Sequence, residues 1–91
     1  MIAPRSTVAF IKDLIPAVTT PTNHEAIVDL TAREKEIFLL AARGLTNAEI
    51  ATTAFISETT VKSHVSSILA KLNLTSRLQV VAFAYENGLL R

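Results

Sequence analysis

Cysteine is absent from this chain of 91 residues, which excludes disulfide bridges and any zinc or redox site built on thiolates. An excess of one charge is also lacking, because nine basic and eight acidic residues give a net charge of +1. Any contact with a polyanion must therefore come from basic residues on one face. No apolar run is long enough to span a membrane. Lys12 and Asp13 interrupt the apolar stretch near Met1, so we expect no secretory signal and a cytoplasmic protein.

Apolar residues make up 49% of the chain, enough for one small domain to form a core without metals or disulfides. Near the N-terminus, the spacing of four apolar residues predicts a short helix, and Ser6 is its candidate N-cap. These residues are Val8, Ile11, Leu14 and Ile15. A segment rich in Pro and Thr, 16–23, follows it and is typical of a linker. We expect a short helix and linker over 1–28 and the folded domain over 29–91.

Four helices are predicted after Leu30, at about 32–43, 47–53, 58–72 and 77–87. The first is expected to bury Ile37, Leu40 and Ala41, with Phe38 beside this face. Three of their starts carry a capping box, in which Ser or Thr is followed three residues later by Glu or Gln. The pairs are Thr31 with Glu34, Thr46 with Glu49, and Ser76 with Gln79. No stretch alternates as a strand would, so the predicted fold class is all-α.

The helix expected at 58–72 has two contrasting faces. Its apolar stripe consists of Val61, Val65, Ile68, Leu69 and Leu72. The opposite side carries small residues, with Lys62 and His64 on its flanks: Thr59, Ser63, Ser66, Ser67 and Ala70. A short capped helix and a tight turn precede it, which is the layout of a helix-turn-helix whose second helix enters the DNA major groove. Lys62 could then donate to a guanine edge, although a solvated surface gives the same pattern.

Two polar residues of this region leave more than one role open. Asn47 lies at a helix N-terminus, which favours a phosphate, but it could equally help the turn after Thr46. His64 is better suited to a structural role or a phosphate contact than to catalysis, since it lacks a cysteine neighbour and a metal-binding spacing. We expect no enzyme activity, no metal and no cofactor.

The helix expected at 77–87 is apolar on more than one side. Val80, Val81 and Ala84 form one face, and a second is formed by Leu78, Ala82 and Tyr85, with Phe83 outside both. A helix of so small a domain buries one face internally, so the second predicts a homodimer interface. The alternative is that the N-terminal segment covers it.

The chain resembles the LuxR-type helix-turn-helix, especially the C-terminal DNA-binding domains of NarL/FixJ response regulators. The resemblance covers about two thirds of the chain and rests on Leu30 to Glu36, Gly44 to Ala51, Thr60 to His64, Lys71-Leu72, Arg77 and Gly88 to Leu90. It implies a four-helix domain that binds double-stranded DNA as a dimer and regulates transcription, with RNA polymerase as a further partner.

The resemblance also implies roles for individual residues. The positions of Lys62 and Ser63 approach bases, and Thr59 and Ser66 join them by position. Phosphate contacts are implied for Asn47, Thr60, His64, Lys71 and Arg77. The last helix supplies the dimer interface, expected at Leu78, Val81, Ala82 and Tyr85. Glu34 corresponds to an acidic residue that ties the first helix to the rest.

The chain departs from the family pattern at Ala54, Phe55, Ser66 and Ser67, so the DNA targets of relatives should not be transferred to it. Residues 2–15 resemble the tail after a receiver domain, which would make this chain a fragment; a standalone regulator is the alternative. A sigma-factor helix-turn-helix fits less well, because those domains end soon after a strongly basic helix. An interaction module that has lost DNA binding also remains an alternative.

Overall fold

The computed structural model describes residues 22–90, and they form a helical domain. A 3-10 turn, η2 (His24–Ile27), precedes α2 (Ala32–Ala42), α3 (Asn47–Ala54), α4 (Glu58–Leu72) and α5 (Arg77–Glu86). The four predicted helices are confirmed, with bounds that agree to within one residue, and no strand occurs over 22–90. The short helix expected around 8–15 lies outside the described residues. None of the helices described here has the length and apolar character that a bilayer crossing requires.

Complete capping boxes start α2 and α3, as the sequence predicts. The Thr31 hydroxyl accepts from the backbone N–H of Glu34 at 3.1 Å, while the Glu34 carboxylate accepts from the Thr31 N–H at 2.9 Å. Thr46 and Glu49 repeat the arrangement at 3.1 and 2.8 Å. Each box satisfies two backbone donors that have no partner inside the helix, which fixes both helix starts.

The box at α5 is only half formed. Ser76 accepts from the backbone N–H of Gln79 at 3.3 Å. The Gln79 side chain, however, accepts from the backbone N–H of Thr75 at 2.6 Å, one residue before the N-cap. The helix start is as predicted, but the glutamine anchors the preceding turn as well.

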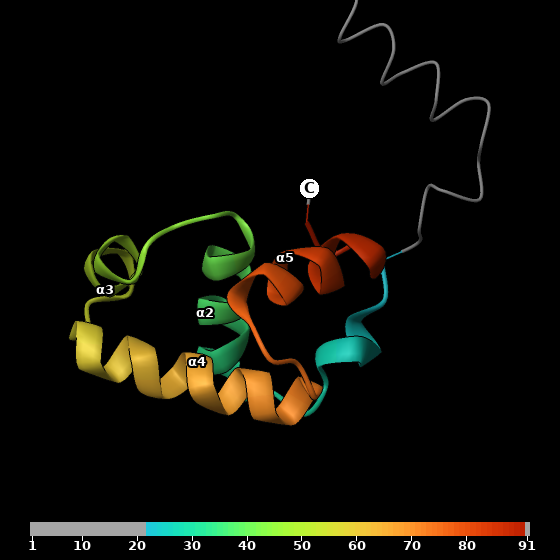
Figure 1. Cartoon of the computed structure of the whole chain (residues 1–91), viewed down its shortest axis with the longest axis horizontal. Helices are drawn as coiled ribbons and strands as arrows, with labels where there is room; N and C mark the ends of the chain where they lie inside the picture. The colour runs from blue at the N-terminus through green and yellow to red at the C-terminus, as the bar shows by residue number, and fades with distance from the viewer. Residues whose placement is uncertain (1–21, 91) are drawn as a thin grey trace, which may run out of the picture.

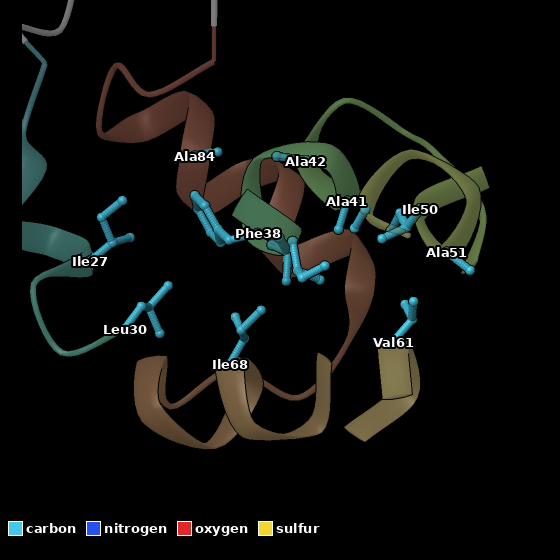
Figure 2. Close-up of a cluster of buried hydrophobic side chains, with 13 residues drawn as sticks. Ile27, Leu30, Phe38, Ala41, Ala42, Ile50, Ala51, Val61, Ile68 and Ala84 are labelled. Carbon is cyan, nitrogen blue, oxygen red and sulfur yellow. The ribbon is translucent and has the colours of Figure 1, made fainter. Parts of the chain in front are cut away.

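Helix α2 lies at the centre of the domain and packs against α3, α4 and α5, while α3 also packs on α4 (Figure 1). The core therefore surrounds α2, and Figure 2 shows side chains from all four helices converging on it. The largest fully buried side chains are Phe38, Ile37, Ile50, Ile68, Val61 and Val80.

Phe38 and Phe83 correct the predicted core. The sequence placed Phe38 beside the buried face of its helix and Phe83 outside both apolar faces. In the structure Phe38 is fully buried, and Phe83 meets it edge to face with ring centroids 6.1 Å apart. The reason is that α2 is covered on several sides, so it buries more than the one stripe expected of a surface helix.

Residues before α2 also belong to the packed unit. Ile27 and Leu30 are each 4% exposed and lie in the core (Figure 2). The backbone N–H of Asn23 donates to the carbonyl of Asn87 at 2.8 Å, just after α5. The packed unit therefore includes residues upstream of 29, where the sequence placed the start of the domain.

Candidate nucleic-acid interface

The turn between α3 and α4 is built from three residues. Phe55 adopts a left-handed conformation with φ 59° and ends α3, and the Ile56 N–H donates to the carbonyl of Ala51 at 3.0 Å. Ser57 then caps α4 by accepting from the Thr60 N–H at 3.1 Å. The two helices are thus joined by a short, fully specified turn, as a helix-turn-helix requires. Phe55 itself is 91% exposed, while the neighbouring Ala54 is buried.

Helix α4 presents a polar face to solvent and an apolar face to the core. Val61 and Ile68 are buried against the other helices (Figure 2). The four residues expected to contact bases are all exposed: Thr59, Lys62, Ser63 and Ser66. Positions 59, 62, 63 and 66 share one side of a helix by their spacing. The ion pairs recorded within 22–90 do not involve Lys62, so its ammonium is available to an incoming ligand.

Ser67 lies elsewhere than the sequence predicted. It was assigned to the outer face of its helix, but its hydroxyl donates to the Glu34 carboxylate at 2.6 Å. Ser67 is therefore half-buried against α2. A carboxylate that reaches across from α2 makes this position part of the packed side, and the outer polar face of α4 is narrower than expected.

Glu34 joins α2 to α4 through a buried charge. Glu34 is 5% exposed, and its carboxylate accepts from the Lys71 ammonium at 2.7 Å as well as from Ser67. The hydrogen bonds from Lys71, Ser67 and the Thr31 backbone lower its pKa from 4.5 to about 2. The expected role of Glu34 in tying the first helix to the rest is confirmed. Lys71, expected at a phosphate, is already paired with this carboxylate.

Two further residues expected at phosphates lie together. The Arg77 guanidinium, at the first residue of α5, donates to the Asn47 side-chain oxygen at 2.5 Å and to the carbonyl of Leu45. The start of α5 is thereby tied to the start of α3. Local sequence patterns could not predict this pairing, because it joins residues 30 positions apart in different helices.

The other end of α3 is held by a second arginine. Arg33 of α2 donates to the carbonyl of Ala54 at 3.1 Å and also pairs with Glu36 at 3.1 Å. Arg33 was not predicted to take part in the site. A long basic side chain near a helix C-terminus can donate hydrogen bonds to the last carbonyls, as Arg33 does at the end of α3. Guanidinium groups from α2 and α5 thus fix the two ends of the helix that precedes α4.

The remaining predicted positions are surface residues of different kinds. Thr60 is exposed, and its hydroxyl shares a hydrogen bond with Ser57 at 2.9 Å. His64 is half-buried on the flank of α4. Within residues 22–90, no group of three or more His, Asp or Glu side chains is arranged to hold a metal ion.

An apolar surface runs along α5 on the side away from the core. Leu78 is 77% exposed and Tyr85 is 70% exposed, Ala82 between them is also exposed, and Val81 is half-buried. Val80 and Ala84 supply the buried face of the same helix. The second apolar face predicted from the sequence is therefore at the surface of the described part of the chain.

Comparison with known proteins gives a consistent result. Residues 28–84 match the family described as bacterial regulatory proteins, luxR family. Over 62 residues, which are 68% of this chain, the sequence is 48% identical to response regulator protein VraR of Staphylococcus aureus and of Staphylococcus epidermidis, and the match covers 30% of those proteins.

Two solved structures share the arrangement of helices. Response regulator StyR superposes with a TM-score of 0.62 and 32% identity over 90% of this chain and 37% of its own. Response regulator ChrA of a heme-sensing two-component system superposes with a TM-score of 0.60 and 35% identity. That match covers 85% of this chain and 36% of ChrA. The chain thus corresponds to about a third of the length of each of these relatives.

Proposed function

This chain belongs to the luxR family of bacterial regulatory proteins and carries the helix-turn-helix of DNA-binding transcriptional regulators; we propose that it binds duplex DNA as a dimer with α4 in the major groove. The observation that carries the proposal is the exposed polar face of α4, which follows a short capped helix inside the matched region. A major groove about 12 Å wide admits one α-helix, whose outer side chains then meet the base edges.

The proposed base contacts come from the exposed face of α4. Ser63, Ser66 and Thr59 let the helix approach the base edges closely, and their hydroxyls can donate or accept. Lys62 supplies the donor suited to the O6 and N7 atoms of guanine. Because most of these groups are short and uncharged, we assign much of the base preference to Lys62.

Phosphate contacts are proposed around this face, at Asn47, Thr60, His64, Lys71 and Arg77. Lys71 has three ammonium donors and Arg77 has five, so each retains donors after its contacts within the protein. Since the net charge of the chain is only +1, the cations Lys71 and Arg77, together with Lys62, carry most of the electrostatic attraction, and affinity should fall with salt.

The second copy is proposed to dock on α5 through Leu78, Val81, Ala82 and Tyr85. The exposed apolar surface of this helix supports that choice. Pairing by two-fold symmetry would place two α4 helices about one helical turn of DNA apart, roughly 34 Å.

For the whole protein we propose the output domain of a two-component response regulator acting at promoters, where RNA polymerase is its further partner. The named relatives are response regulators about three times as long as the matched region. On this proposal the sequence 1–28 connects to a receiver domain. Bacterial promoters lie in the cytoplasm, which is the location proposed here.

Selection of duplexes from a random pool at physiological salt tests the proposal. We expect wild type to enrich a motif with two half-sites. Lys62→Ala should lower the affinity for that motif by about 1–3 kcal/mol and relax one base position in each half-site.

Arg43→Ala is the matched control, because Arg43 is an exposed cation that follows α2. It should leave the motif intact even where it alters the salt dependence. If Lys62→Ala retained the wild-type motif, α4 would not be the base-contacting helix. If no protein enriched any motif, an interaction module without DNA binding would be favoured.

A further inference from the structure

The contact between Arg77 and the start of α3 links α5, which carries the proposed dimer surface, to the helix-turn-helix proposed to bind DNA. We propose that Arg77 is a positioning residue: it fixes α5 relative to the helix-turn-helix and so sets the separation of the two α4 helices on DNA. This inference rests on the proposed dimer through α5. It concerns the spacing between half-sites and not the identity of their bases.

The packing of the helices makes this contact significant. The main packing of α5 is on α2, whereas α3 packs mainly on α4 and α2. Arg77 bridges α5 to α3 directly, with one guanidinium nitrogen on Asn47 and the other on the Leu45 carbonyl. A planar fork with two donors fixes an orientation as well as a distance, which a single point charge does not.

The proposed dimer surface begins next to this bridge. Leu78 immediately follows Arg77, and Tyr85 lies two turns further along the same helix. A change in the tilt of α5 at its first residue therefore changes how each helix-turn-helix is directed from the dimer axis.

Small changes of tilt are enough to matter. Each α4 would lie about 17 Å from the two-fold axis, half of the roughly 34 Å between major grooves on one side of DNA. A tilt of α5 that moved each α4 by about 1.7 Å along the DNA would alter the separation of the two helices by about 3.4 Å, which is the rise of one base pair. Selectivity for one half-site spacing requires the position of each α4 to be held more tightly than this.

Arg77→Lys separates positioning from simple attraction to phosphate. Lysine keeps the positive charge but lacks the fork, so a phosphate contact would be largely preserved while the bridge to Asn47 and Leu45 is lost. Arg33→Lys is the matched control: it makes the same chemical change at the other end of α3, where the bond to Ala54 comes from α2 and not from α5. Asn47→Ala removes one of the two acceptors of Arg77 and serves as a second variant.

The experiment measures affinity for duplexes that carry the half-sites selected by the wild-type protein. One series has the selected spacing and spacings one base pair shorter and longer, and a further duplex has a single half-site. We expect Arg77→Lys and Asn47→Ala to reduce the preference for the selected spacing by about tenfold, a size typical of coupling between two sites. Both residues are also proposed phosphate contacts, so a loss that is common to all duplexes, including the single half-site, cancels in the ratio of affinities between spacings. Arg33→Lys should keep the wild-type spacing profile.

Three results would overturn the inference. An Arg77→Lys spacing profile like that of wild type would show that the bridge does not set the separation. Equal losses on all duplexes, with the spacing preference unchanged, would leave Arg77 only its proposed phosphate contact or a role in folding. Equal broadening by Arg33→Lys would point to general loosening of α3. A wild-type protein without any spacing preference would instead refute the proposed dimer.

Discussion

Replacement of Glu34 by glutamine should remove a stabilising charge while leaving the shape of the side chain and one oxygen for the capping box. The carboxylate has a pKa of about 2 in the folded domain, held there by its bonds to Lys71 and Ser67, against an ordinary value of 4.5. The difference corresponds to about 3 kcal/mol in the free energy of unfolding. Lys71 is partly exposed, so solvent screening makes this figure an upper limit.

The pH dependence identifies the source of the effect. A pKa that is lower in the folded state stabilises the protein above the unfolded value, and this contribution is lost as the pH falls through the folded value. The difference between wild type and Glu34→Gln should therefore be complete above pH 5 and close progressively towards about pH 2.

Urea unfolding followed by far-UV circular dichroism, at a series of pH values, measures this difference. Glu36→Gln is the matched control, because Glu36 is in the same helix but is about half exposed and pairs only at the surface. It should change stability by less than about 1 kcal/mol. A Glu34→Gln deficit that stayed constant from pH 7 to pH 2 would refute the argument, since the loss would then come from packing and not from charge.

Other substitutions test the core, the turn and the proposed dimer. Phe38→Ala should lower the free energy of unfolding by about 3–5 kcal/mol in urea titration, because it empties a fully buried site and ends the contact with Phe83; a loss under about 1 kcal/mol would mean that the core closes around the gap. Phe55→Gly should raise stability by up to about 1 kcal/mol, since φ is 59° and the ring is exposed, whereas a loss would reveal packing by the ring. Leu78→Asp combined with Tyr85→Asp should abolish the cooperativity with which two copies bind a two-site duplex in sedimentation titrations; retained cooperativity would place the dimer contact elsewhere.

Local signals in the sequence were sufficient to locate the helices. Capping residues and helical spacing act over three or four positions, so Thr31 and Thr46 mark helix starts without knowledge of the rest of the fold. The exposed face of α4 could be predicted for the same reason, because Val61 and Ile68 must face the core.

Contacts between distant helices could not be predicted in this way. Ser67 has the sequence character of a surface serine, and only the approach of Glu34 from α2 makes it part of the packed side. The family resemblance implied a phosphate contact for Arg77 and for Asn47, and their pairing with each other depends on how α5 meets α3. Phe38 was underestimated because the sequence does not show how many neighbours surround α2.

The hydrogen bonds before α2 and after α5 bring both ends of the described chain to one corner. The Thr22 hydroxyl donates to the Gly88 carbonyl at 3.2 Å, and the Asn23 and Asn87 side chains pair at 3.1 Å. This corner lies at the far end of the molecule from the α3–α4 turn (Figure 1). Because its two ends lie close together, the domain could be inserted into a surface loop of another protein, or circularly permuted by joining these ends. Neither change would obstruct the helices proposed to contact DNA.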